Sequence, residues 1–124
     1  MTTGKSILVA DDEQEVRNLL CLLLEDQGYN VTTAADGDDA IAQLERRAFD
    51  LLLLDIRMPH LSGFDVLKYV REHHPQSKVI MLTAFAELAN AMESKYLGAD
   101  DFIGKPYDPH EVLMAIERVL GVAG

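Results

Sequence analysis

Three aspartates and one lysine each follow a short apolar run, and these residues are the best candidates for chemistry in the chain. Short apolar runs bounded by polar residues are typical of strands that are buried on both faces. The charged side chains are therefore expected at the carboxyl ends of strands, and in an open parallel sheet those ends share the edge where ligands bind. The runs and the residues behind them are Ile7–Ala10 before Asp11 and Asp12, Leu51–Leu54 before Asp55, and Phe102–Gly104 before Lys105.

This combination of side chains suits a divalent cation and an anion in one site. Mg²⁺ prefers oxygen ligands and usually takes one or two carboxylates together with waters and phosphate oxygens. Asp12 and Asp55 can supply the carboxylates, and Asp11 can add negative charge and hold a metal-bound water. Lys105 offers a compact cation and Thr83 a hydroxyl donor to the oxygens of a transferring phosphoryl group. The set predicts a site for phosphoryl transfer.

Each of these residues also has an ordinary structural interpretation when it is taken alone. Asp11 or Asp12 could be the N-cap of the following helix. Lys105 precedes a proline and could be a loop residue, and Thr83 could be a turn or cap residue. Taken together, the residues favour a phosphoryl-transfer site over separate structural roles, because four of the five predicted strands end in a residue of the type that such a site requires.

Helices are predicted between the strands from apolar residues at i, i+3 and i+4 spacing. The first helix is expected to end near Gly28, and Pro75 closes the third. The last helix has the clearest start, with Asp108 as N-cap, Pro109 in the first turn and Glu111 completing a capping box. The predicted apolar faces are Val16, Leu19, Leu20, Leu23 and Leu24; Ala40, Ile41 and Leu44; Phe64, Leu67 and Val70; and Val112, Leu113, Ile116, Val119 and Leu120.

Further apolar runs at 29–34 and 79–82 complete five repeats of strand then helix. This alternation implies a parallel sheet with right-handed crossovers and helices on both faces. We expect one α/β domain over residues 1–124, a doubly wound (βα)5 flavodoxin-like fold with a five-stranded parallel sheet in the order 2-1-3-4-5. That order makes the first and third strands neighbours. The helix predicted over about 87–97 has few large apolar residues, so its contact with the sheet is expected to be weak.

Composition fits a soluble domain of common size. The chain has 124 residues, of which 48% are hydrophobic and 26% charged, as in ordinary globular proteins. Its net charge of -10 argues against direct binding to nucleic acid or anionic lipid, because both depend on clustered Lys and Arg. No run is long enough to span a membrane and no signal peptide is evident, so a cytoplasmic location is expected. Cys21, the only cysteine, suits a reducing compartment.

In combination the motifs resemble the receiver domain of bacterial two-component response regulators, and the resemblance covers nearly the whole chain. It implies that Asp55 is the phosphoacceptor, that Asp11 and Asp12 hold Mg²⁺ together with Asp55, and that Lys105 and Thr83 contact the acyl phosphate. Mn²⁺ could take the place of Mg²⁺. The motifs are Asp11-Asp12-Glu13, Asp55-Ile56-Arg57-Met58-Pro59 with Gly63, Thr83-Ala84 and Lys105-Pro106.

The resemblance carries further expectations. The backbone carbonyl of Arg57 would ligate the metal, and the Lys105–Pro106 bond would be cis. Thr83 and Phe102 would switch a surface made of the fourth helix, the fifth strand and the fifth helix, although ordinary strand packing is an equal alternative for Phe102. Arg57 and Phe85 lie where family members vary and where the lifetime of the phosphorylated state is tuned.

The resemblance also implies partners. The phosphoryl donor would be a sensor histidine kinase or a phosphotransfer protein, and the signal would pass to an output domain or protein, with a phosphorylation-dependent homodimer as one form of output. The chain could be part of a longer regulator. Such a domain is regulatory and catalyses only its own phosphorylation and dephosphorylation.

Two other classes of function compete with this interpretation. An aspartyl phosphatase or phosphotransferase also begins with an aspartate at a strand end, but such enzymes usually place a second acid two residues later, where this chain has Arg57. An interaction module could keep the fold without its chemistry. That alternative is disfavoured because every chemical position is intact.

Overall fold

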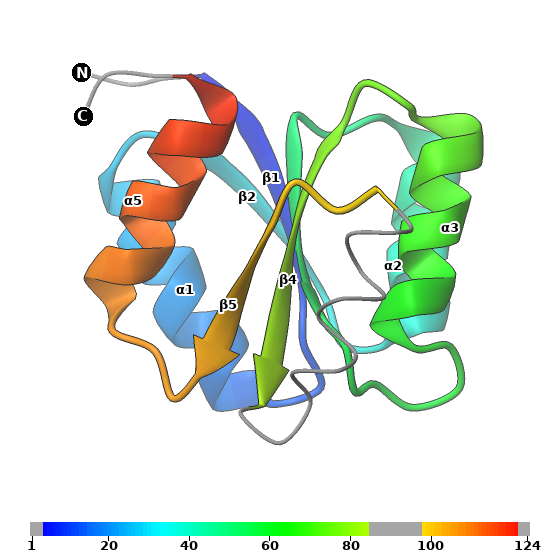
Figure 1. Ribbon diagram of the computed structural model, residues 1–124, viewed down its shortest axis with the longest axis horizontal. Helices are drawn as coiled ribbons and strands as arrows, with labels where there is room; N and C mark the ends of the chain where they lie inside the picture. Colours follow the sequence, from blue (N-terminus) through cyan, green and yellow to red (C-terminus); the bar gives the residue numbers. More distant parts are fainter. Residues whose placement is uncertain (1–3, 85–97, 122–124) are drawn as a thin grey trace.

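The computed structural model contains a central parallel sheet between two layers of helices (Figure 1). The structure describes residues 4–84 and 98–121, so the helix predicted over about 87–97 and Phe85 lie outside the described residues. The strands are β1 (Ser6–Ala10), β2 (Asn30–Ala34), β3 (Leu51–Asp55), β4 (Lys78–Ala84) and β5 (Asp101–Lys105). The described helices are α1 (Gln14–Asp26), α2 (Gly37–Arg46), α3 (Gly63–His73) and α5 (Pro109–Leu120).

The strands pair in the predicted order, β2-β1-β3-β4-β5, and all four pairings are parallel. The register places Ala10 beside Leu54, so the ends of β1 and β3 are level with each other. On the other side, Asp55 is beside Leu82, and Ala84 is beside Lys105. The α/β fold is therefore the expected one, and its carboxyl edge gathers the candidate residues.

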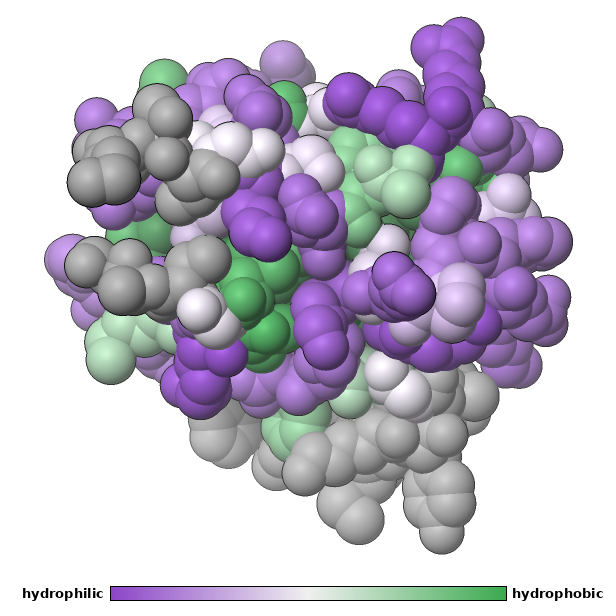
Figure 2. All heavy atoms as spheres, turned by 90° about the horizontal axis from the view of Figure 1, so that it is seen from above, coloured by the Kyte–Doolittle hydropathy of each residue, from purple (hydrophilic) through white to green (hydrophobic). Residues whose placement is uncertain are grey.

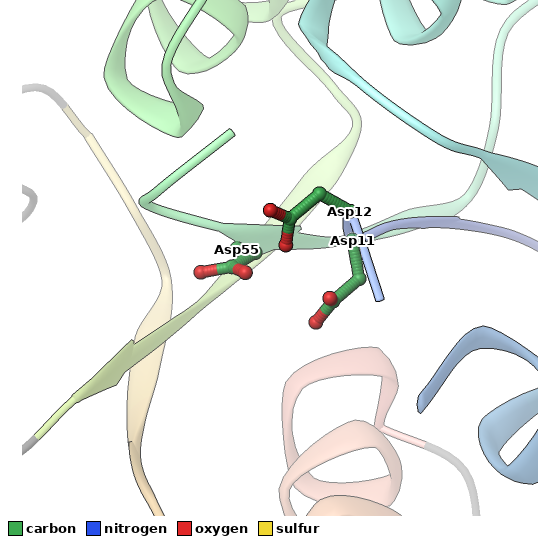
Figure 3. Close-up of side chains that lie close together, drawn as sticks. All are labelled: Asp11, Asp12 and Asp55. Carbon is green, nitrogen blue, oxygen red and sulfur yellow. The ribbon is translucent and has the colours of Figure 1, made fainter. Parts of the chain in front are cut away.

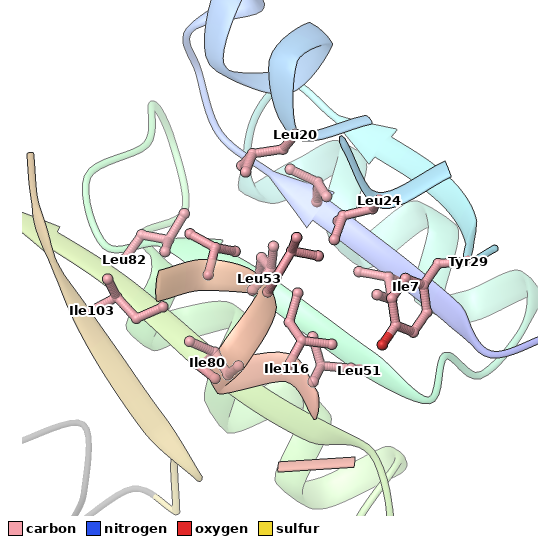
Figure 4. Close-up of a cluster of buried hydrophobic side chains, with 14 residues drawn as sticks. Ile7, Leu20, Leu24, Tyr29, Leu51, Leu53, Ile80, Leu82, Ile103 and Ile116 are labelled. Atoms are coloured by element: carbon pink, nitrogen blue, oxygen red, sulfur yellow. The ribbon is translucent and has the colours of Figure 1, made fainter. Parts of the chain in front are cut away.

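Alternation along the central strands divides the core into two layers. Ile7, Val9, Leu51 and Leu53 face α1 and α5 (Figure 4), whereas the residues between them in sequence face α2 and α3. All the apolar residues of β1 from position 7 and of β3 are fully buried, as expected for strands covered on both faces. Each buried aliphatic side chain of this kind contributes about 1.5–3 kcal/mol to folding.

Helix α5 begins as predicted. The Asp108 carboxylate accepts the backbone N–H of His110 at 2.8 Å, the Glu111 carboxylate accepts the N–H of Asp108 at 3.3 Å, and Gly121 ends the helix in the left-handed conformation. A second capping box, formed by Ser62 and Asp65 at the start of α3, was not predicted.

The N-cap alternative for Asp11 and Asp12 is wrong, because the N-cap of α1 is Glu13. Its side chain makes no capping hydrogen bond. The apolar face predicted for α1 is also too wide. Leu19 is 54% exposed, since the helix turns only Leu20 and Leu24 fully into the core. None of the helices within residues 4–84 and 98–121 is long and apolar enough to cross a membrane.

The amino ends of the strands form the opposite end of the molecule, which presents mainly hydrophilic side chains with smaller apolar areas between them (Figure 2). There the backbone N–H and the hydroxyl of Ser6 both donate to the Asp50 carboxylate, at 2.8 and 3.2 Å. A cavity of about 320 Å³ lies beside this contact, and its lining includes Lys5, Lys78 and Leu120. The amino end of the sheet therefore carries a cavity with two lysines in its lining, whereas the candidate site residues lie at the carboxyl end.

Candidate functional site

Three carboxylates converge at the carboxyl edge of the sheet (Figure 3). Asp55 is the last residue of β3, and Asp11 and Asp12 directly follow β1, its neighbour in the sheet. One ligand oxygen from each of the three side chains lies within 4.8 Å of the others. Asp11 is fully buried and Asp55 is 6% exposed, whereas Asp12 is exposed. The group is thus open to solvent on the side of Asp12.

Lys105 reaches this group from the end of β5, which lies at the edge of the sheet beside β4. Its Nζ donates to Asp11 Oδ2 and to Asp55 Oδ2, both at 3.2 Å. One ammonium therefore bridges two carboxylates, one from the end of β3 and one from the residue that follows β1. The Lys105–Pro106 bond is cis, as expected.

The two buried carboxylates are also held by backbone groups. Asp11 Oδ1 accepts the N–H of Glu13 at 2.9 Å, and Asp55 Oδ1 accepts the N–H of Arg57 at 3.1 Å. Both bonds join an aspartate to the residue two positions later, an arrangement that fixes the side chain against its own loop. Each carboxylate thus has one oxygen on a backbone N–H and the other on Lys105.

Burial governs the electrostatics of Asp55. The pKa of Asp55 is raised to about 6, and burial is the largest cause of the rise. The charge of Lys105 opposes the rise and the like charge of Asp11 adds to it, while the hydrogen bonds from the Arg57 N–H and from Lys105 lower the pKa. Burial alone would lower the pKa of Lys105, but the charges of Asp55 and Asp11 and the hydrogen bonds to them raise it above its ordinary value. The lysine is a cation at neutral pH.

Thr83 and Phe102 occupy neighbouring strands near the site. Thr83 is buried in β4, one residue beyond Leu82, the register partner of Asp55. Phe102 is half-buried in β5 beside Met81 and packs against the apolar layer under α2 and α3. These positions are compatible with the expected roles, which stay predictions.

The loop after β3 passes very close to Asp55. A Cβ atom added to Gly63 would lie 2.5 Å from the Asp55 carbonyl oxygen, so only glycine fits this approach. Gly63 belongs to the motif that begins at Asp55, but the spacing of the motif in the sequence does not predict this contact.

Arg17 is a neighbour of the site that the sequence reasoning missed. Its Nη1 donates to the backbone carbonyl of Asp11 at 2.7 Å. A signal was present in the sequence, because a cation in the first turn of a helix is disfavoured by the helix dipole and therefore indicates a compensating partner.

The donor set fits a hard divalent cation. The side-chain ligands gathered here are carboxylate oxygens, which Mg²⁺ and Mn²⁺ prefer. Among the residues that the structure describes, the three closely spaced carboxylates face one bridging ammonium, and uncompensated charge on the two buried carboxylates is costly. A cation bound at Asp11, Asp12 and Asp55 would relieve that excess.

Comparison with known proteins gives a consistent result. Residues 7–117 match the family described as the response regulator receiver domain. The chain is 40% identical over 119 residues to the transcriptional regulatory protein ResD of Bacillus subtilis, covering 96% of the chain and 49% of ResD. It is 43% identical over 114 residues to CpxR of Escherichia coli, and this match covers 92% of the chain and 48% of CpxR. The chain thus spans about half the length of these relatives.

Solved structures show the same architecture. A CheY-like response regulator receiver domain protein from Methanospirillum hungatei superposes with a TM-score of 0.91 at 34% identity, covering 96% of this chain and 95% of that one. The chemotaxis response regulator CheY4 of Vibrio cholerae gives a TM-score of 0.88 at 34% identity, and the match covers 94% of this chain and 99% of CheY4.

Proposed function

The chain belongs to the response regulator receiver domain family, and on that premise we propose that it accepts a phosphoryl group on Asp55 in a Mg²⁺-dependent transfer from a sensor histidine kinase or a phosphotransfer protein. The observation that carries the proposal is the convergence of three carboxylates within 4.8 Å, two of them 3.2 Å from the Lys105 ammonium. Donors of this chemical class and an output domain or protein are the proposed partners, and the cytoplasm is the proposed location.

Asp55 is the nucleophile in this proposal. An oxygen of its carboxylate forms a bond to phosphorus while the P–N bond of the donor phosphohistidine breaks, and the departing imidazole keeps that electron pair. The side chain is ready for this step because the Arg57 N–H fixes one carboxylate oxygen at 3.1 Å. Asp55 itself is only 6% exposed, and the site opens to solvent on the side of the exposed Asp12.

Lys105 and Thr83 act on the transferred group. The ammonium offsets negative charge on the phosphoryl oxygens, and it favours the ionised carboxylate against the burial that raises the pKa of Asp55 to about 6. The Thr83 hydroxyl can donate to one phosphoryl oxygen. Asp11, Asp12, Asp55 and the carbonyl of Arg57 would hold Mg²⁺, which when bound supplies positive charge to the phosphoryl oxygens.

The consequence of phosphorylation is a shift between two conformations. The added charge draws Thr83 toward the phosphoryl oxygens and allows the Phe102 ring to move inward, which changes the surface around β5 and α5 and the segment 87–97. ResD and CpxR are described as transcriptional regulatory proteins. A transcriptional output, with homodimer formation on phosphorylation, is the corresponding proposal for this chain.

The test is phosphorylation by acetyl phosphate and Mg²⁺, followed by intact mass. The wild type should gain one phosphoryl group, Asp55→Asn should gain none, and removal of Mg²⁺ with a chelator should abolish the gain. Asp26→Asn, which makes the same charge change at an exposed residue of α1, should behave as the wild type. An Asp55→Asn protein that is modified at the wild-type rate refutes the assignment.

A further inference from the structure

Arg17 lies in the first turn of α1, and its guanidinium contacts the backbone of the site rather than a carboxylate. We propose that Arg17 is a positioning residue that fixes the Asp11–Asp12 peptide unit and thereby sets the affinity for Mg²⁺. This inference rests on the proposed function, since it concerns the same metal site.

The hydrogen bond itself is short and protected. Arg17 is half-buried, and its Nη1 lies 2.7 Å from the Asp11 carbonyl oxygen, a distance typical of a charge-assisted hydrogen bond. The location is unfavourable for a cation, because the amino end of a helix carries partial positive charge. An arginine held there with its guanidinium on a single carbonyl therefore indicates a specific positioning contact.

The contact bears on Asp12 through the geometry of the peptide bond. A peptide unit is planar, so holding the Asp11 carbonyl oxygen also sets the direction in which the chain enters Asp12. The other polar groups of Asp11 are fixed by different partners: its N–H donates to the Ala34 carbonyl at 3.2 Å, and its carboxylate accepts from Glu13 and Lys105. With the Arg17 hydrogen bond to its carbonyl, the N–H, the carbonyl and the carboxylate of Asp11 all have a partner.

Asp12 is the ligand that most needs such a restraint. Its side chain is exposed, and within residues 4–84 and 98–121 no hydrogen bond or ion pair holds its carboxylate. No contact of the carboxylate itself fixes its position relative to Asp11 and Asp55, so the direction of the backbone at Asp12 is the restraint that the structure supplies. Loss of the Arg17 contact would let the peptide rotate and would increase the entropy lost when the three carboxylates gather around an ion.

Electrostatics alone makes the opposite prediction. The guanidinium is a positive charge near a cation site, so its removal should tighten Mg²⁺ binding if charge is its only influence. Removal of a positioning contact should weaken binding. The sign of the change in Kd therefore separates the two effects.

The experiment measures the Kd for Mg²⁺ by isothermal titration calorimetry at neutral pH. Arg17→Met, which keeps much of the side-chain length without a donor, should bind Mg²⁺ roughly tenfold more weakly. Arg17→Gln provides a second neutral variant with a shorter side chain. Arg17→Lys keeps a charged donor and should stay within about threefold of the wild type. Arg118→Met makes the same charge change at an exposed ion pair with Asp101 and should leave the Kd unchanged.

The rate of phosphorylation by acetyl phosphate gives an independent readout. Arg17→Met should be slow at limiting Mg²⁺ and should approach the wild-type rate at saturating Mg²⁺, because Lys105 and Asp55 are unaltered. Folding of each variant is checked by circular dichroism.

Equal or tighter Mg²⁺ binding by folded Arg17→Met or Arg17→Gln overturns the inference and leaves the proposed function standing. A wild type that neither binds Mg²⁺ nor gains a phosphoryl group overturns both proposals. The two failures are therefore distinguishable.

Discussion

Lys105 joins two aspartates that the sheet has already brought side by side, and the balance of charge at Asp55 depends on that contact. The pKa of Asp55 is raised to about 6, because the effect of burial outweighs that of the ammonium 3.2 Å away, which favours the ionised form. The proposed nucleophile is therefore ionised at neutral pH although it is almost wholly buried.

The raised pKa of Asp55 makes stability depend on pH. Because the pKa moves from 3.8 to about 6 on folding, the folded metal-free protein binds more protons than the unfolded chain between these values. The stability linked to this residue is fully present below pH 3.8 and is lost as pH rises through about 6. The expected loss is on the order of 3 kcal/mol.

Urea unfolding at a series of pH values, with chelator present, measures this effect as the difference between the wild type and Asp55→Asn. The difference should grow in favour of Asp55→Asn from pH 4 to about 7, since the amide does not ionise. Parallel profiles for the two proteins would contradict the raised pKa.

Residue types at strand ends were sufficient to predict which side chains meet, because parallel strands place their carboxyl ends together whatever the details of packing. The contact of Arg17 with a backbone carbonyl was not predicted, since it depends on the conformation of a long side chain rather than on spacing. The exposure of Leu19 was missed for a related reason: periodicity identifies the apolar side of a helix but not how much of that side the sheet covers.

At the scale of elements, the loop between β3 and α3 connects the site to a neighbouring helix. Gly63 passes against the Asp55 carbonyl, and Gly37 at the start of α2 passes against Leu61 in the same loop, where an added Cβ would overlap with the Leu61 carbonyl oxygen. His60 in that loop has a φ of 68°, and its imidazole pairs with Asp38 on α2 at 3.0 Å. The loop is therefore held on both sides.

Substitution of Gly63 should test this close approach. Gly63→Ala places a methyl group 2.5 Å from the Asp55 carbonyl oxygen, and relief requires the backbone to move, so a loss of about 2–3 kcal/mol in the free energy of unfolding is expected. Gly104→Ala in β5 meets nothing within 4 Å and should change stability by less than about 1 kcal/mol. Urea midpoints give both values; equal effects of the two substitutions would show that the loop can yield.

Local chemistry explains which elements could be predicted. The start of α5 was predicted because a capping box is made by residues three apart in sequence. The capping box of α3 carries the same signal, in Ser62 and Asp65, and could have been found. The tight passage of Gly63 over β3 could not, because it depends on where a loop lies in space.

At the scale of the whole molecule, negative charge opposes folding, and part of it is concentrated at one edge of the sheet. The net charge of -10 opposes compaction through self-repulsion, and three of the acids are gathered at one edge of the sheet. Alternation of strands and helices made a parallel sheet with right-handed crossovers predictable, and the observed order is one of the common orders of doubly wound sheets. The cavity at the amino edge was not, since a gap between loops and a helix end leaves no periodic signal in the sequence.

Mg²⁺ should therefore stabilise the folded protein. An ion that binds only the folded state adds about 1.4 kcal/mol at ten times its Kd, which corresponds to a rise in melting temperature of several degrees. Asp12→Asn removes one ligand without disturbing a buried group and should reduce the rise, whereas Asp26→Asn should keep it. A melting temperature that is insensitive to millimolar Mg²⁺ in the wild type would count against the metal site.

The cavity lined by Lys5 and Leu120 has a practical consequence, because Lys5 directly precedes the amino end of β1 whereas Asp55 is at the carboxyl end of β3. A linker to a biosensor chip, or a fluorescent label, attached at that end would leave the acidic edge facing the solution. Immobilised in this orientation, the molecule could be titrated with metal or presented with a bulky donor without obstruction by its own attachment point.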